Sequence, residues 1–264
     1  MRSGAATSSG TALVTGASAG LGAEFARQLA ARGCDLLLVA RREERLKELA
    51  RELGAAHGVR VDVLAADLED REAPARIEAF VAEQGLRIDW LVNNAGVAGP
   101  DLLEDRDWSA QARFFELMML SVAQMCHRFI PPMRERGFGR VINVSSFAGR
   151  LSRPAGANYG PAKTYLIALS EELALILRGS GVHVSALCPG FTHTEFHEAA
   201  GLMDMKRSLP GFVWYDAATV VREGIEAVER GKPIWISGRL YRWLDPLAQS
   251  VWLRPLLKAL APGR

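Results

Sequence analysis

Cysteine and histidine are scarce in this chain of 264 residues, which contains three of the first and five of the second. Cys34, Cys126 and Cys188 lie far apart in apolar runs, and no histidine has neighbours at the spacing of metal ligands. These counts exclude a disulfide framework and give no support for a metal site. We expect buried, reduced thiols and a cytoplasmic protein.

The chain also lacks an excess of charge of one sign and a long apolar run. Its 32 basic and 30 acidic residues leave a formal net charge of +2, which provides no electrostatic argument for nucleic-acid binding. No apolar run approaches the roughly 18 residues of a membrane-spanning helix. The first ten residues are small and polar and do not have the apolar region of a secretory signal. We expect residues 1–10 to be a flexible lead.

What the chain does contain is an alternation of short apolar runs and helical patterns. Leu21, Phe25 and Leu29 recur every four residues and predict one helix face, which Gly33 ends. Strands are predicted at 11–15, 36–39, 59–66, 88–93, 141–145, 182–188 and 233–237. Further helices are predicted at 43–53, 71–84, 113–136 (interrupted near Pro131 and Pro132), 158–178 and 216–230. Continuously apolar strands that alternate with helices favour a doubly wound α/β fold with a parallel sheet.

The stretch from Thr15 to Gly22, TGASAGLG, follows the first predicted strand and opens the first predicted helix. Glycines there allow a sharp turn and a close approach of a pyrophosphate, whose charge then lies at the helix N-terminus. Tight packing without a ligand is the alternative interpretation. The position directly after the first strand favours a nucleotide.

Five short motifs occur in a fixed order and, from about residue 11 to 237, resemble the short-chain dehydrogenase/reductase family. They are the Gly-rich turn, Asn93-Asn94-Ala95-Gly96, Val144-Ser145-Ser146, Tyr159-x-x-x-Lys163 and Pro189-Gly190. The resemblance implies a single three-layer Rossmann-type domain over residues 11–238 with a seven-stranded parallel sheet. It also implies nicotinamide-dependent hydride transfer to or from a small carbonyl or alcohol compound. The helices at 113–136 and 158–178 would pair subunits in a homodimer or homotetramer.

Ser146, Tyr159 and Lys163 are the candidate catalytic residues. Tyr159 and Lys163 are four residues apart and share one helix face, so an ammonium can favour a phenolate whose free pKa is roughly 10. Pro161 fits between them only where a helix has just begun. Ser146 lies thirteen residues before Tyr159, the interval that the family uses for its catalytic serine. Its hydroxyl would bind the substrate oxygen, and we prefer it to Ser145.

The end of the second predicted strand bears on the choice of cofactor. An acidic residue there would bind the ribose 2′-hydroxyl of NAD, but this chain has Ala40 followed by Arg41 and Arg42. Two guanidinium groups suit a 2′-phosphate, so we expect NADP(H) rather than NAD(H). A solvated pair that opens a charged helix is the alternative interpretation.

The resemblance implies further cofactor contacts. Asp67 and Leu68 would contact the adenine, and Asn93 would brace the sheet. The remaining expected contacts are Gly16, Ser18, Ala19, Gly20, Leu21 and Gly22 in the Gly-rich turn, Asn94, Ala95 and Gly96 along the cleft, Tyr159 and Lys163, and Pro189, Gly190, Thr192 and Thr194 at the nicotinamide.

One position departs from the family pattern. Most members carry an asparagine 28 residues before the catalytic serine, where it holds a water of the proton relay, but this chain has Met118 there. A thioether is at best a weak acceptor. The relay then works without that side chain, or the enzyme is slow, or the protein binds cofactor without turnover as a sensor or scaffold.

Two segments beyond the motifs bear on the substrate and partners. A substrate flap at about 195–211 carries Phe196, Leu202, Met203, Met205 and Leu209, which suggests an apolar substrate; His193 and His197 lie near its mouth. Residues 239–264 form an amphipathic extension with Trp243 and Trp252 among basic residues. It can lie on a membrane surface. Packing within an oligomer or over the pocket is the interpretation that we favour.

Overall fold

A computed structural model describes residues 10–151, 158–194 and 210–253. Among these, seven strands form one parallel sheet in the order β3-β2-β1-β4-β5-β6-β9. The strands are β1 (Thr11–Thr15), β2 (Asp35–Ala40), β3 (Val61–Ala65), β4 (Ile88–Asn93), β5 (Gly139–Val144), β6 (Val182–Pro189) and β9 (Ile234–Ser237). This order confirms the predicted doubly wound, seven-stranded fold.

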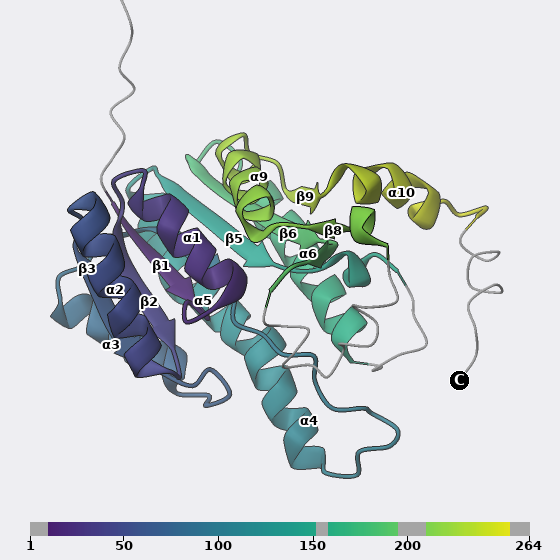
Figure 1. Ribbon diagram of the computed structural model, residues 1–264, viewed down its shortest axis with the longest axis horizontal. Helices are drawn as coiled ribbons and strands as arrows, with labels where there is room; N and C mark the ends of the chain where they lie inside the picture. Colours follow the sequence, from purple (N-terminus) through teal and green to yellow (C-terminus); the bar gives the residue numbers. More distant parts are fainter. Residues whose placement is uncertain (1–9, 152–157, 195–209, 254–264) are drawn as a thin grey trace, which may run out of the picture.

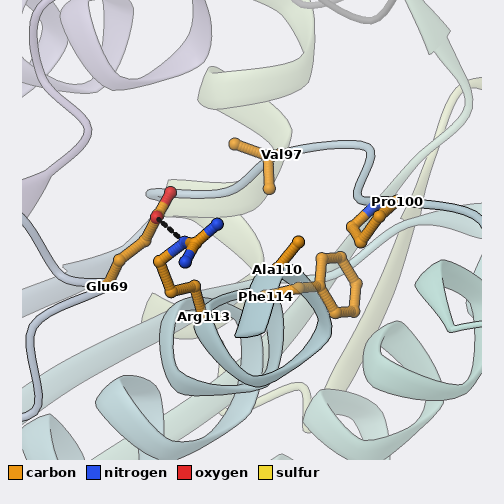
Figure 2. Close-up of a pocket in the computed structure, with 6 residues that line it drawn as sticks. All are labelled: Glu69, Val97, Pro100, Ala110, Arg113 and Phe114. Atoms are coloured by element: carbon orange, nitrogen blue, oxygen red, sulfur yellow. Dashed lines mark ion pairs between the residues drawn. The ribbon is translucent and has the colours of Figure 1, made fainter. Parts of the chain in front are cut away.

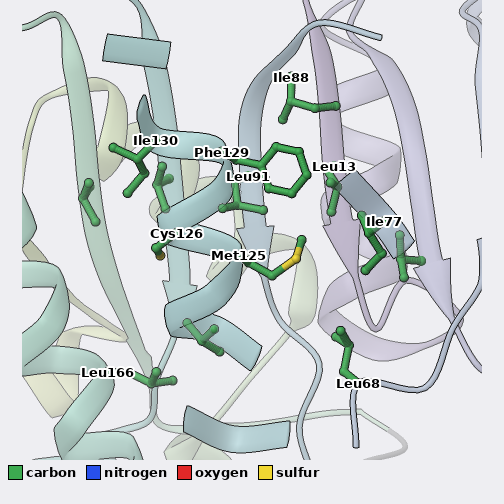
Figure 3. Close-up of a cluster of buried hydrophobic side chains, with 14 of the residues drawn as sticks. Leu13, Leu68, Ile77, Ile88, Leu91, Met125, Cys126, Phe129, Ile130 and Leu166 are labelled. Atoms are coloured by element: carbon green, nitrogen blue, oxygen red, sulfur yellow. The ribbon is translucent and has the colours of Figure 1, made fainter. Parts of the chain in front are cut away.

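Helices cover both faces of the sheet. Figure 1 shows the sheet between these two helix layers. One layer consists of α1 (Gly20–Ala30), α2 (Glu43–His57) and α9 (Ala217–Glu229), and the other of α3 (Ala73–Glu83), α4 (Trp108–Phe115), α5 (Ser121–Glu135) and α6 (Tyr159–Ile176). The side chains of β1 alternate between the layers, so Ala12 and Val14 pack on the first and Leu13 on the second. Figure 3 shows Leu13 and Leu91 facing Met125 and Phe129 in the second layer.

The helix predicted at 113–136 differs from the structure in two ways. It begins earlier, at Trp108, because the carboxylate of Asp107 accepts a hydrogen bond from the backbone N–H of Ser109 at 2.9 Å and caps α4. Its irregularity is a π-helical turn at Glu116–Leu120 between α4 and α5. The predicted interruption near Pro131 and Pro132 is wrong, since both lie within α5, close to its end at Glu135.

Smaller elements complete the described chain. A two-stranded parallel sheet joins β7 (Phe191–Thr192) to β8 (Trp214–Tyr215), and α10 (Arg239–Gln249) follows β9 at the periphery. The three thiols are free and buried, as predicted. Within the described ranges, no helix has the length and apolarity needed to span a bilayer.

Candidate active site

The Gly-rich turn between β1 and α1 packs so closely on the loop after β4 that side chains would not fit. A Cβ on Gly16, whose φ is +65°, would lie 2.8 Å from Asn94 Nδ2, and one on Gly22 would lie 2.6 Å from the same atom. Ala19 precedes α1 without a side-chain cap, so the first backbone N–H groups of the helix face outward for an anion. Gly20 approaches Thr194, the last described residue before the flap.

Thr15 joins the ends of β1 and β4 and was not among the candidate residues. Its Oγ1 accepts hydrogen bonds from the backbone N–H groups of Asn94, at 3.0 Å, and Ala95, at 3.1 Å. The side-chain amide of Asn94 in turn donates to Thr15 O at 3.0 Å. Asn93 donates to Asn143 Oδ1 at 2.9 Å and braces β4 against β5, as predicted.

The two arginines after β2 lie beside the Gly-rich turn and the turn after β3. Arg42 donates from Nε and Nη2 to Ser18 Oγ, at 3.1 and 3.0 Å. Arg41 Nη1 lies 3.8 Å from Asp67 Oδ2 and 3.5 Å from Glu69 Oε1. Arg42 therefore contacts the turn that would hold a phosphate, whereas the charge of Arg41 is shared with two carboxylates.

Glu69 connects this corner to α4 and was missed by sequence reasoning, since a lone acidic residue in a turn carries no distinguishing pattern. Its Oε2 lies 3.6 Å from Arg113 Nε, beside a hollow of about 180 Å³ (Figure 2). Val97, Pro100, Ala110 and Phe114 complete the lining. The hollow adjoins the turn of Asp67 and Leu68, the residues expected at the adenine.

The two serines after β5 have different surroundings. Ser145 is buried, and its hydroxyl donates to the backbone carbonyl of Lys163 at 2.7 Å, so it holds α6 to the sheet. Ser146 is partly exposed, and its Oγ accepts from the N–H of Ala148 at 3.1 Å. As the acceptor in that bond, the Ser146 hydroxyl keeps its own hydrogen to donate. This difference favours Ser146 over Ser145 as the substrate-binding hydroxyl.

Tyr159 and Lys163 lie in the first two turns of α6, which begins at Tyr159. Pro161 is therefore in the first turn, where proline is tolerated because its missing N–H has no partner within the helix. Lys163 Nζ lies 5.7 Å from the centroid of the Tyr159 ring. The same nitrogen donates to Val144 O at 2.8 Å. The Lys163 side chain is buried, and burial lowers its pKa from 10.5 to about 8. The ammonium is thus mostly retained at neutral pH, close to the phenol.

Met118 lies in the π-helical turn and faces this lysine across Gly96. A Cβ on Gly96 would lie 3.2 Å from Met118 Sδ and 3.7 Å from Lys163 Nζ. The thioether sulfur accepts a hydrogen bond from the N–H of Val97 at 3.4 Å. The side chain is fully buried. The position expected to carry an asparagine is therefore filled by an apolar group that packs beside the lysine.

The loop after β6 is supported by α10. The hydroxyl of Tyr241 accepts from the N–H of Phe191 at 3.2 Å and donates to Val213 O at 2.8 Å, and a Cβ on Gly190 would overlap its ring. Thr192 is buried and its hydroxyl donates to Gly190 O at 3.1 Å. Sequence reasoning did not single out Tyr241, whose packing beside this loop becomes visible only in the tertiary structure.

The expected substrate contacts are partly outside the described residues. His193 stacks on Trp214, with ring centroids 5.2 Å apart. His197 and the five apolar flap residues fall in 195–209, outside the described ranges. In the C-terminal extension, Trp243 and Trp252 are exposed.

Known proteins resemble this chain over most of its length. The sequence pattern of the family described as short chain dehydrogenase matches residues 10–204. Sulfoacetaldehyde reductase 2 of Chromohalobacter salexigens is 35% identical over 186 residues, which are 70% of this chain and 73% of the relative.

Two solved structures cover almost the whole chain. A short-chain dehydrogenase from Sphingobium yanoikuyae in complex with NADPH has 31% identity, a TM-score of 0.79 and 96% coverage of both chains. The bulky-bulky ketone specific alcohol dehydrogenase from Comamonas testosteroni has 27% identity and a TM-score of 0.76, with 96% of this chain and 95% of that chain covered. With the Gly-rich turn, the serine pair and the Tyr159–Lys163 helix in one place, the chain belongs to the short-chain dehydrogenase family of oxidoreductases.

Proposed function

We propose that the protein is an NADPH-dependent oxidoreductase that interconverts a carbonyl compound and its alcohol, with Tyr159 as the general acid and base. The observation that carries this proposal is the placement of Tyr159 on the first turn of α6, with the buried Lys163 ammonium 5.7 Å from its ring. Ser146 follows β5, the strand to which Lys163 is bonded through Val144 O.

The described residues fit a nicotinamide dinucleotide. Gly16 and Gly22 let the turn pack closely on the loop after β4, and the N-terminus of α1, which has no side-chain cap, would receive the pyrophosphate. Arg42 and Ser18, joined by two hydrogen bonds, would hold a 2′-phosphate. Asp67 and Leu68 would contact the adenine, and Pro189 to Thr194 would contact the nicotinamide. The NADPH complex of the Sphingobium protein supports this choice of cofactor.

The chain's own residues would perform the proton chemistry. NADPH, when bound, supplies the hydride that the carbonyl carbon receives. The hydroxyl of Ser146 donates a hydrogen bond to the carbonyl oxygen and stabilises the charge that develops there. Tyr159 Oη transfers its proton to that oxygen, which becomes the alcohol, and Lys163 stabilises the phenolate that remains. In the oxidative direction the same proton returns to Tyr159.

An apolar ketone of small to middle size is the proposed substrate. The rings of Phe191 and Trp214 lie 5.1 Å apart beside the loop after β6 and would give this side of the site an apolar wall. The likeness to a dehydrogenase specific for bulky-bulky ketones supports the same class.

A second candidate function is a cofactor-binding sensor or scaffold with little turnover. Met118 favours it, because its buried thioether stands where a polar side chain would serve proton transfer. Tyr159→Phe separates the two functions. An enzyme loses turnover by about 10²-fold or more without its general acid, whereas a sensor keeps both its cofactor binding and its effect in cells.

The cofactor assignment is tested by titrating the purified protein with NADPH and NADH and following nicotinamide fluorescence. We expect NADPH to bind more tightly, and Arg42→Asp to weaken NADPH binding by about 10- to 100-fold, because one charge-assisted contact is lost and a repulsion is added. Arg51→Asp, the same charge change within α2, is the matched control. Tighter binding of NADH would contradict the proposal.

The reaction is tested with a panel of aliphatic and aromatic ketones, following loss of NADPH absorbance in wild type and Tyr159→Phe. Turnover by the wild type that the variant lacks supports the enzyme. Cofactor binding without turnover of any ketone or alcohol would favour the sensor.

We further propose that the protein forms a homodimer or homotetramer in which α5 and α6 meet a second copy. Leu175 and Ile176, at the end of α6, are 50% and 67% exposed and would be covered in such an assembly. Light scattering after size exclusion measures the mass directly. A monomer at micromolar concentration would contradict this proposal.

A further inference from the structure

Gln111 is a fully buried glutamine on α4, the first helix after the loop that follows β4. Only 1% of its surface is exposed, and its side-chain amide takes part in two hydrogen bonds. Its Oε1 accepts a hydrogen bond from Asn158 Nδ2 at 2.7 Å, and its Nε2 donates to the backbone carbonyl of Asp101 at 3.0 Å. One side chain thus links the loop after β4, helix α4 and the start of α6.

The amide of Gln111 is fixed in one orientation by these two bonds. Rotation by half a turn would place its NH₂ group against the NH₂ of Asn158 and its carbonyl against the carbonyl of Asp101, so both bonds would be lost. Because Gln111 and Asn158 are both buried, water cannot readily replace either partner. The link therefore specifies a geometry as well as joining the segments.

Asn158 immediately precedes Tyr159 and occupies the cap position of α6. Asparagine there ordinarily caps its own helix, but this side chain makes no capping bond and reaches Gln111 instead. The first residue of a helix is where fraying begins, and here that residue is Tyr159.

The start of α6 is held from two directions. On the side of the sheet, Ser145 donates to Lys163 O, Lys163 donates to Val144 O, and Thr164 Oγ1 donates to Gly149 O at 2.7 Å. These contacts fix the second turn of the helix. The bond between Gln111 and Asn158 comes from α4, on the second helix layer, and acts on the first turn.

We propose that Gln111 is a positioning residue for Tyr159, which it holds beside Lys163 by binding Asn158, while its second bond fixes the loop between β4 and α4. This inference rests on the proposed acid–base role of Tyr159. Without the link, the first turn of α6 loosens, and the phenol spends less time near the ammonium.

The test compares wild type with Gln111→Leu and Gln111→Met, which keep the volume and remove both hydrogen bonds. The first readout needs no substrate: the phenol of Tyr159 is titrated by ultraviolet absorbance as the difference from Tyr159→Phe. We expect less of this phenol to be ionised at about pH 8, where Lys163 is still partly charged, because the ammonium stabilises the phenolate less. Gln124→Leu on α5, whose amide donates to Arg71 O, is the matched control and should leave it unchanged.

The second readout is steady-state kinetics with a ketone that the wild type reduces. We expect kcat to fall by about tenfold in the Gln111 variants, with a smaller change in KM for NADPH, because the contacts of the Gly-rich turn and Arg42 remain. Gln111→Glu retains an acceptor for Asn158 and should recover part of kcat. Asn158→Leu should match Gln111→Leu, and the double variant should lose little more than either single one.

A purely structural role has a different signature. If the Gln111 variants lower the melting temperature while the ionisation of Tyr159 and kcat stay at the wild-type values, the proposal is overturned. If no ketone is reduced by the wild type, the proposed reaction fails, but the titration of the Tyr159 phenol still decides the positioning role. Unfolding of both variants would leave Asn158→Leu, which carries the same expectation and the same contradiction.

Discussion

Replacing Lys163 by Met in the cofactor-free protein measures the free-energy cost of burying the Lys163 ammonium. The side chain is 5% exposed, and burial lowers its pKa from 10.5 to about 8. Between these values the unfolded chain holds a proton that the folded chain has released, so the free energy of unfolding rises with pH in this window. Each pKa unit corresponds to about 1.4 kcal/mol, so a charged Lys163 lowers the stability by about 3 kcal/mol below pH 8.

The assay is guanidinium unfolding of both proteins at a series of pH values from about 7 to about 10. Relative to Lys163→Met, the wild type should gain about 2–3 kcal/mol across this range. Titrating groups that do not interact with Lys163 are common to both proteins and cancel in the difference. The hydrogen bond lost at Val144 O adds an offset that does not depend on pH. A difference that stays constant to within about 0.5 kcal/mol would refute the lowered pKa and the reasoning that follows from it.

Three further substitutions test the close contacts of the site. Gly16→Ala places a methyl group 2.8 Å from Asn94 Nδ2 at a φ of +65°, so NADPH binding measured by fluorescence should weaken and the melting temperature should fall. Gly149→Ala brings a methyl group 2.8 Å from the backbone carbon of Lys163, which should cost about 1–3 kcal/mol by chemical unfolding. Met118→Asn puts a polar amide near the ammonium, so the pH above which the reaction rate falls should increase. If that pH does not change, a role for the thioether is contradicted.

Most of the fold was predictable from the sequence because its strands are covered on both faces. Short, continuously apolar runs such as Leu36 to Val39 predict buried strands from local sequence alone. The end of each run then places the following motif at the carboxyl edge of the sheet. The start of α6 was equally predictable, because Pro161 restricts where a helix can begin and α6 does begin at Tyr159. These features depend on local sequence alone.

The features that sequence reasoning missed depend on contacts between distant residues. The hydrogen bond from Asn158 to Gln111 spans 47 positions, and a glutamine early in a helix reads as a solvated side chain. The π-helical turn at Glu116–Leu120 changes the helical periodicity over one turn only, which is too short for the spacing of apolar residues to reveal. Pro131 and Pro132 suggested an interruption, but α5 continues through both. Local secondary-structure propensity predicts neither the long-range hydrogen bond nor the π-helical turn.

Burial explains the lowered pKa of Lys163, and Met118 is part of the apolar surroundings near Gly96. A buried ammonium keeps its charge when polar groups surround it, and here the described contacts of its nitrogen are one carbonyl, at 2.8 Å, and the face of the Tyr159 ring. On the side of Gly96 the neighbour is a thioether, which offers weak acceptance and no mobile proton. Burial therefore dominates, and the pKa falls to about 8. An ammonium that titrates there supports the phenolate of Tyr159 below pH 8 and withdraws that support above it. The proposed proton transfer should therefore weaken above about pH 8.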